Sequence, residues 1–335
     1  MIEFKPTPEQ TAMLVKAGSY DYNTYIGAAR EVTKAIELPL RQATLPGDIL
    51  GNVFTTIKLA PGASPEFPLG LMAPGTEKEY IGYTIPKQGY LPHKLMEGDY
   101  VMLTTYPIGC SLDIGLRILR DAQWNVMKEF MQGLANQITK KKNDDGMHTL
   151  LAAAKDRNII VYDADAAVGQ LTKRLFSLSK VVMRRNGGGN SSSINRKRLT
   201  DVWLSPEGVE DMRNWGVDQL DDTSRREIYV ADDNSGVVSR VFGVNLHDTD
   251  EFGVGQEYQL YYSNTLNGSL ATGGDVEMAL GLDLSRNSSF IHAIREELQL
   301  FEDPAQHRHQ KFSMYGWEEG GWASLDTRQC IIMSF

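Results

Sequence analysis

Two aspartates follow an apolar run in the stretch IIVYDADAAVG (159–169), and carboxylates at the end of a buried strand can do chemistry. In phosphoryl transfer, one such carboxylate attacks while the other acts as acid or base. Here the residues that follow the pair are alanines, and the later stretch TGGDVEMAL supplies no second acidic pair. We therefore expect Asp163 or Asp165 to cap a helix that begins near Ala164.

A glycine-rich segment between basic residues, VMRRNGGGNSSSINRKR (182–198), suggests a loop that grips phosphate. A phosphate loop needs Gly-Lys-Ser/Thr after its glycines, and it runs from a strand into a helix so that backbone amides point at the ligand. This segment lacks that ending and follows a helix rather than a strand. It is therefore expected to be a hinge, in which Gly and Ser let the chain turn.

The other candidate ligand sets are incomplete. FGVGQEY (252–258) has a tyrosine where a dinucleotide fingerprint needs its third glycine, and is expected to be a hairpin turn. DTDEFG (248–253) has a phenylalanine at a calcium-ligand position. His307 and His309 alternate on an expected extended segment and have no third zinc ligand nearby. Cys110 and Cys330 have no metal-like spacing. No catalytic, cofactor-binding or metal-binding residue is expected.

Charge and composition restrict the function further. The 335 residues include 43 acidic and 34 basic ones, which gives a net charge of −9. Such a chain has no general attraction for a nucleic-acid backbone or for an anionic membrane. The first residues, MIEFKPTPEQ, lack the apolar core of a signal peptide. These features indicate a protein made and kept in the cytoplasm, without a membrane partner.

Three helices are expected from apolar spacing and end signals. The segment YIGAAREVTKAIEL (25–38) is the first, ended by a region with two prolines. Residues 121–142 carry apolar side chains at steps of four and end in lysines, and NDDG (143–146) is expected to stop them. The third runs from about 164 to 185, with apolar residues at steps of three and four. A shorter helix is expected within SPEGVEDMRNW, with Ser205 as N-cap and Pro206 in its first turn.

The remaining chain favours strands. Those expected are NIIVY, LTDVWL, REIYVA, RVFGVNLHD, YQLYYSN, MALGLDL and a hairpin that turns at Glu318–Gly321 before a last strand at Cys330–Met333. Two more, VFTTIKL and DYVMLTTY, bracket about forty residues rich in Pro, Gly and Tyr (52–106). That segment is too long and too weakly periodic to bury its own core, and it is expected to lie on another surface. Together these elements indicate an α+β protein.

The order of these parts strongly resembles that of the major capsid proteins of tailed bacteriophages, the Hong Kong phage type shell fold. The phrases that carry the resemblance are GDYVMLTTYPIGCSLDIGLRILRDAQW, LTDVWLSPEGVEDMRNW, RVFGVNLHDTDEFGVGQEYQL and GWASLDTRQCIIMSF. The resemblance covers essentially the whole chain. It implies an N-terminal arm (1–50), an extended loop (51–105), a peripheral domain with a long spine helix (106–156), an axial domain (157–298), and C-terminal strands that return to the peripheral domain (299–335).

The resemblance also implies a function. It predicts a structural protein, not an enzyme, that assembles with itself into hexamers and pentamers of an icosahedral shell around packaged double-stranded DNA. No sequence-specific DNA binding is implied. The expected partners are a scaffolding protein, a portal and a decoration or cement protein. The protein is expected to be located in the virion, after assembly in the host cytoplasm. Because the chain starts directly at the arm, a separately encoded scaffold or prior processing is expected.

Several alternatives accompany this interpretation. A bacterial nanocompartment shell protein has the same fold but encloses enzymes. A haloacid-type phosphohydrolase would use Asp163 and Asp165 for catalysis. Some relatives join subunits by a Lys–Asn cross-link, and Lys87 and Lys94 lie in the matching loop, but no partner Asn or catalytic Glu can be matched. Within a shell, the cations beside the glycine-rich hinge are expected to face acidic surface on an adjacent subunit; they are Arg184, Arg185, Arg196, Lys197 and Arg198.

Overall fold

The structure is a computed structural model, and it describes residues 8–43, 50–60, 62–68, 100–121, 124–186, 197–215, 240–270, 276–285 and 289–335. The chain divides into two compact units, which are described separately. Unit 1 comprises Met1–Pro65, Met102–Gly146 and His292–Trp322, and unit 2 comprises Glu66–Val101, Met147–Ile291 and Ala323–Phe335. The expected strand at 226–231 and the hinge residues 187–196 lie outside the described residues.

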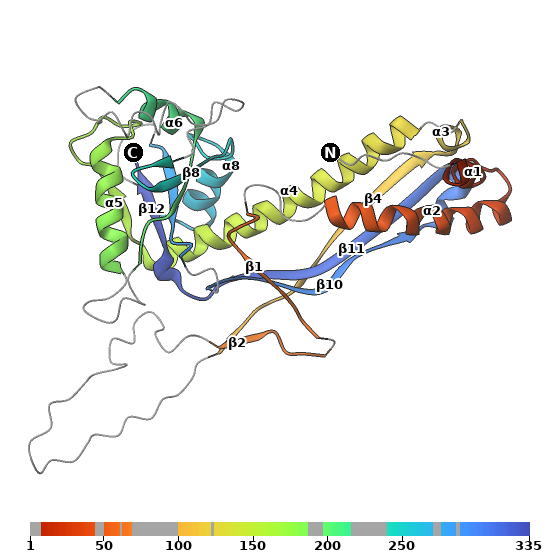
Figure 1. Ribbon diagram of the computed structural model, residues 1–335, viewed down its shortest axis with the longest axis horizontal. Coiled ribbons are helices and arrows are strands. Elements are labelled where there is room, and N and C mark those ends of the chain that lie inside the picture. Colours follow the sequence, from red (N-terminus) through yellow and green to blue (C-terminus); the bar gives the residue numbers. More distant parts are fainter. Residues whose placement is uncertain are drawn as a thin grey trace, which may run out of the picture. The chain divides into compact units, whose positions relative to one another are not determined.

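Unit 1 is built on a four-stranded sheet with the order β1 (Thr55–Lys58), β10 (Phe290–Glu302), β11 (Lys311–Ser324) and β4 (Tyr106–Gly115). β11 and β4 pair antiparallel, from Lys311 opposite Gly115 to Gly320 opposite Tyr106. Along β4, more buried and exposed residues alternate, as on a sheet with one covered face. Figure 1 shows the long strands β4, β10 and β11 side by side.

Helices cover this sheet. They are α1 (Pro8–Ala17), α2 (Tyr22–Ala43), α3 (Leu116–Arg120) and α4 (Trp124–Arg157). Their apolar side chains share one core with those of the strands, including the fully buried Leu14, Tyr25 and Phe312. Residues 8–43, part of the expected N-terminal arm, are thus packed into a core. The helix expected at 25–38 corresponds to α2, which is longer than expected and continues through Pro39 to Ala43.

The expected end of the long helix at NDDG was wrong. α4 continues through residues 143–146 to Arg157, which at ~1.5 Å per residue makes it roughly 50 Å long. Two of the polar residues that suggested a turn, Asn143 and Asp144, are buried within the helix instead, and so is the adjacent Lys142. Lys142 forms an ion pair with Glu318 of β11 at 2.6 Å, and both side chains are almost fully buried. Gly146 packs so closely that a Cβ there would lie 2.4 Å from Leu50 Cδ1.

Unit 2 contains a six-stranded sheet with the order β5 (Ile160–Tyr162), β12 (Cys330–Ser334), β9 (Met278–Leu282), β6 (Asp201–Leu204), β8 (Val244–Asp248) and β7 (Arg240–Val241). Every residue of β6, β9 and β12 is buried, as expected for strands covered on both faces. β12 lies between β5 and β9. The last strand therefore belongs to unit 2, whereas the resemblance implied that all of 299–335 returns to the peripheral domain.

Two helices pack on one face of the six-stranded sheet, α5 (Lys173–Asn186) and α6 (Pro206–Arg213). The Ser205 cap of α6 is confirmed, since its Oγ accepts a hydrogen bond from Gly208 N at 3.1 Å. The start of α5 near Ala164 was wrong. Thr172 Oγ1 accepts from Leu175 N at 3.1 Å and so caps α5 at Lys173, while Gly169 turns the preceding chain with a φ of +74°.

Two expected strand features were also wrong. YQLYYSN forms α8 (Glu257–Leu260) and a π-helical turn (Tyr261–Thr265), because Tyr258 and Tyr262, four residues apart, are both fully buried. Gly320 and Gly321 do not form a hairpin turn, since β11 runs through them. A Cβ on Gly321 would lie 2.6 Å from the carbonyl oxygen of Thr104, so glycine here permits close strand packing.

A further two-stranded ribbon pairs β2 (Glu66–Pro68) with β3 (Tyr100–Met102).

Two glycines of the four-stranded sheet differ in how closely other atoms pack against them, and this difference can be tested. A Cβ on Gly316 of β11 would lie 2.7 Å from the backbone oxygen of Gln299, whereas one on Gly109 of β4 would come no closer than 3.5 Å to Gly316 O. We predict that Gly316→Ala lowers the free energy of unfolding by about 1–3 kcal/mol, because backbone must shift. The matched variant Gly109→Ala should change it by less than about 0.5 kcal/mol. Urea unfolding measures both, and equal effects would contradict the described pairing of β10, β11 and β4.

Candidate functional site

The aspartate pair after β5 is engaged in structural contacts. Arg174 Nη1 forms ion pairs with Asp163 Oδ1, at 3.3 Å, and with Asp165 Oδ2. Thr172 Oγ1 donates to Asp163 Oδ2 at 2.8 Å, so Asp163 steadies the residue that caps α5. A cavity of about 480 Å³ beside Asp163 is lined, among the described residues, by no lysine or arginine that could hold a phosphate. The geometry favours a structural role over phosphoryl transfer.

The two histidines were wrongly expected on an extended segment. They lie in a 3-10 helix (Pro304–His309) that Asp303 caps. His307 Nε2 lies 3.1 Å from the carbonyl oxygen of Ser19, and its ring lies 4.4 Å from the ring of Tyr25. Arg308 Nε donates to His309 Nε2 at 3.2 Å. Within the part of the chain that the structure describes, no three His, Cys, Asp or Glu side chains gather as a metal site, and no helix is long and apolar enough to cross a membrane.

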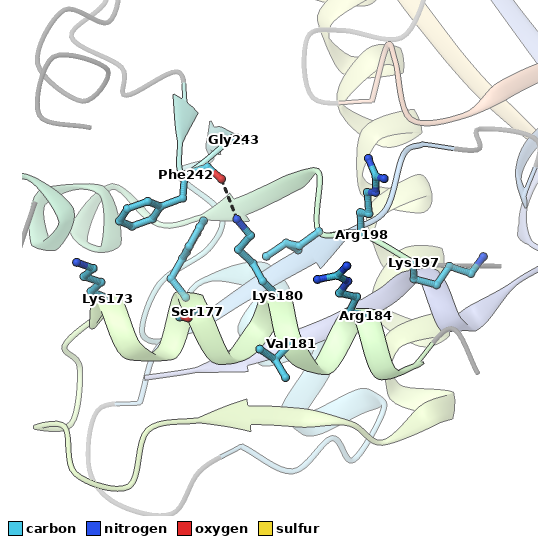
Figure 2. A pocket seen from close by; sticks show the side chains of 11 residues that line it. Lys173, Ser177, Lys180, Val181, Arg184, Lys197, Arg198, Phe242 and Gly243 are labelled. Carbon is cyan, nitrogen blue, oxygen red and sulfur yellow. Dashed lines mark hydrogen bonds between the residues drawn. The ribbon is translucent and has the colours of Figure 1, made fainter. Parts of the chain in front are cut away.

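Several cations gather in a concave surface of unit 2 that we call the basic groove. Its volume is about 530 Å³. The described residues that line it are Lys173, Phe176, Ser177, Lys180, Val181, Arg184, Lys197, Arg198, Leu199, Phe242 and Gly243. Five of these are cations and none is an acid, in a chain whose net charge is −9. Figure 2 shows Lys173 and Phe242 at one end, Lys180 in the middle, and Arg184 and Arg198 toward the other end.

One wall of the basic groove is the turn between β7 and β8. Phe242 and Gly243 have φ values of +49° and +77°, the positive values that tight hairpin turns of type I′ require. A bulky residue rarely takes this conformation, so its surroundings must hold it. Lys180 Nζ donates to the Phe242 carbonyl oxygen at 2.8 Å, and Lys173 Nζ lies 5.6 Å from the centre of the Phe242 ring. No local pattern in the sequence indicated the role of this turn.

Lys197 differs from the other cations of the basic groove. Its ammonium lies 2.7 Å from Asp326 Oδ2, and both side chains are mostly buried. Asp326 also accepts hydrogen bonds from Arg328 Nε at 2.9 Å and from the Arg328 backbone N. The expectation that Lys197 faces an adjacent subunit was therefore wrong, since its charge is neutralised within unit 2. Arg196 lies outside the described residues.

Comparisons with known proteins identify the fold. No protein-family model matches the sequence, and no curated protein matches it. Solved structures do match. A chain of Microbacterium phage Oxtober96 aligns with a TM-score of 0.56 at 9% identity, covering 86% of this chain and 90% of that one. The cyanophage Pam1 capsid aligns with a TM-score of 0.52 at 12% identity, covering 84% and 88%.

A third match comes from an archaeal particle. The virus-like particle from Pyrococcus furiosus aligns with a TM-score of 0.50 at 7% identity, covering 90% of this chain and 99% of that one. The sequence identities are low, so these structural matches establish the fold alone. The chain therefore has the mixed α+β fold of phage capsid chains, which confirms the fold class expected from the sequence.

The Lys197–Asp326 pair gives a prediction with a defined pH dependence. Burial alone would raise the pKa of Asp326, but the hydrogen bonds and charges of Arg328 and Lys197 outweigh it, so the pKa lies below the ordinary value of 3.8. The pair thus stabilises the fold above that value and ceases to do so as pH falls through the lowered pKa. Asp326→Asn should cost about 3–5 kcal/mol of unfolding free energy at pH 7, because it leaves a buried ammonium unpaired.

Urea unfolding at pH 7 and at successively lower pH checks this expectation, with Asp165→Asn as the control because the Asp165 side chain is largely exposed. The control should change stability by less than about 1 kcal/mol. The difference between wild type and Asp326→Asn should shrink only below pH 4. A difference that disappears between pH 7 and pH 5 would contradict the assignment.

Proposed function

We propose that this protein is the major capsid protein of a tailed phage, which assembles with itself into the hexamers and pentamers of an icosahedral shell around packaged double-stranded DNA. The observation that carries the proposal is the fold, which matches the cyanophage Pam1 capsid over 84% of this chain. The sequence supports it independently. Residues 52–106 contain about forty residues with little apolar periodicity, and such a segment is stable when it lies on a partner surface.

The proposed domains correspond in part to the two units. Residues 51–105 form the extended loop that lies over a neighbouring subunit, apart from β1, which belongs to the four-stranded sheet of unit 1. Residues 106–156 form the peripheral domain with α4 as spine helix, and the helices of the N-terminal arm (1–50) support it through their shared core. Residues 157–298 form the axial domain near the centre of each hexamer or pentamer, except that β10, from His292 onward, belongs to the sheet of unit 1. Residues 299–335 return to the peripheral domain through β11, while β12 completes the sheet of the axial domain.

The charge balance suits a container for DNA. With 43 acidic and 34 basic residues, the subunit has no general attraction for a phosphate backbone, so DNA can be packed and released. In this role the protein acts in the virion as a structural component and not as an enzyme, without a cofactor. Its partners are further copies of itself, a scaffolding protein, a portal and a decoration or cement protein.

A second candidate function has a specific observation in its favour. The Pyrococcus furiosus match is described as a virus-like particle and is covered over 99% of its length. A nanocompartment shell built from this subunit would enclose protein cargo in place of DNA. The content of particles isolated from the native source separates the two functions, since nuclease-protected double-stranded DNA supports the phage shell and an enzyme cargo supports the nanocompartment.

Self-assembly is the first prediction of this proposal. The purified protein, alone or expressed with its scaffold, should form capsomers or shells of megadalton mass, because about forty residues within 52–106 have little apolar periodicity and are expected to lie on a partner surface. Sedimentation velocity and electron microscopy measure the mass and the shape. A single monomeric species over a broad concentration range would contradict the proposal.

Removal of the loop tip separates folding from assembly. Deleting residues 61–94 and joining the flanking strands by a short turn should leave a folded subunit, because the described core residues of both units lie outside this range. Circular dichroism and the melting temperature should stay close to wild type while particles fail to form. A matched control inserts a flexible linker of equal length in place of the deleted residues. Intact shells from the deletion would contradict the proposed clamp between subunits.

A further inference from the structure

The basic groove has cationic side chains that the fold does not use. Lys197 is paired with Asp326, and Lys180 supports the turn at Phe242. Arg184 and Arg198 are exposed, and neither guanidinium forms an ion pair with any described residue. A guanidinium presents a rigid fork of donors that suits carboxylates and phosphates. Two such groups in one concave surface of an acidic protein indicate a binding site for an anion.

The aromatic wall of the basic groove argues against a nucleotide. Base recognition by stacking needs an open ring face. The Phe242 ring has Lys173 over it at 5.6 Å, the Trp215 ring near-parallel to it at 6.3 Å and the Phe176 ring at 6.2 Å. These three contacts already occupy the ring. Duplex DNA is not favoured either, because a chain with a net charge of −9 has no general attraction for a phosphate backbone. The anion that fits best is therefore a set of carboxylates on a protein surface. Val181, an exposed apolar side chain beside the cations, can contact an apolar side chain that lies next to those carboxylates.

The same unit carries a surface with the matching chemistry, which we call the acidic surface. A cavity of about 490 Å³ is lined by Pro206, Glu207, Asp250, Phe252, Gly253, Val254, Gln256 and Glu277. The described lining holds three acids and no cation, and Val254 is an exposed apolar side chain among them.

We propose that the basic groove of one copy receives the acidic surface of a second copy of this chain, an inference that rests on the proposed shell function. The two surfaces use different residues, so each copy can bind one neighbour through its groove and another through its acidic surface. Such head-to-tail contacts close into rings when the rotation between copies allows it. The contact therefore acts between subunits of one hexamer or pentamer, and it is weakened by salt because the charges are exposed.

Charge reversal tests the groove. The double variant Arg184→Glu/Arg198→Glu should fold normally, with an unchanged melting temperature, because both side chains are exposed. The protein concentration at which half of the subunits assemble should rise at least about tenfold, since each exposed pair contributes a factor of roughly 1.4 to 5 and reversal adds repulsion. The control is Arg185→Glu, a change of the adjacent exposed arginine on α5 that does not line the groove. It should assemble within about twofold of wild type.

A charge swap then identifies the partner surface. Adding Glu207→Lys and Asp250→Lys to the double variant restores opposite charges across the contact, so assembly should return to within about threefold of wild type. Assembly of the double variant at the wild-type concentration, or no recovery in the swap, overturns the proposal. The proposal is also overturned if the wild type binds pyrophosphate and the double variant loses this binding but still assembles normally. The groove would then be a site for small anions. A wild type that stays monomeric overturns the shell function and the contact together, whereas the other outcomes overturn the contact alone.

Discussion

The buried ion pair between Lys142 and Glu318 is the interaction on which the continuity of the fold depends. It lies where α4 carries the polar stretch KKKNDDG, a sequence that would end most helices. A buried ammonium and a buried carboxylate cost free energy unless they meet, and at 2.6 Å each neutralises the other. The helix can therefore continue from residues buried in the unit 1 core, such as Leu134, to residues buried in unit 2, such as Leu150.

This pair also explains which parts of the fold could be predicted from the sequence. Elements with local signals were predicted correctly, such as β12 and the Ser205 cap of α6. The errors arose where partners distant in sequence override a local signal. NDDG continues as helix directly after Lys142, which pairs with Glu318, and the two glycines after Glu319 serve close strand packing instead of a turn. Neither distant partner can be read from a local pattern.

The candidate site shows the same limit. The basic residues beside the glycine-rich segment drew attention in the sequence, and three of them, Arg184, Lys197 and Arg198, do line the basic groove. Lys197 looks equivalent to the two arginines in sequence, yet it pairs with Asp326, a residue 129 positions away. Phe242 had no local signal, because its role comes from a positive φ and from two lysines of α5. The sequence showed which residues of the groove are charged, but not which of them form ion pairs within the fold.

The position of β12 in the sheet of unit 2 has a consequence for folding kinetics. β12 pairs in parallel with β5 through Ile332 and Ile160, and antiparallel with β9 through Cys330 and Leu282. Until it inserts, the facing edges of β5 and β9 have unpaired backbone groups, which is the arrangement that promotes aggregation. Pairings between such distant residues are slow to form, because a long loop must close before any contact stabilises it. Crowding nascent subunits together before β12 pairs would therefore favour aggregates over ordered particles.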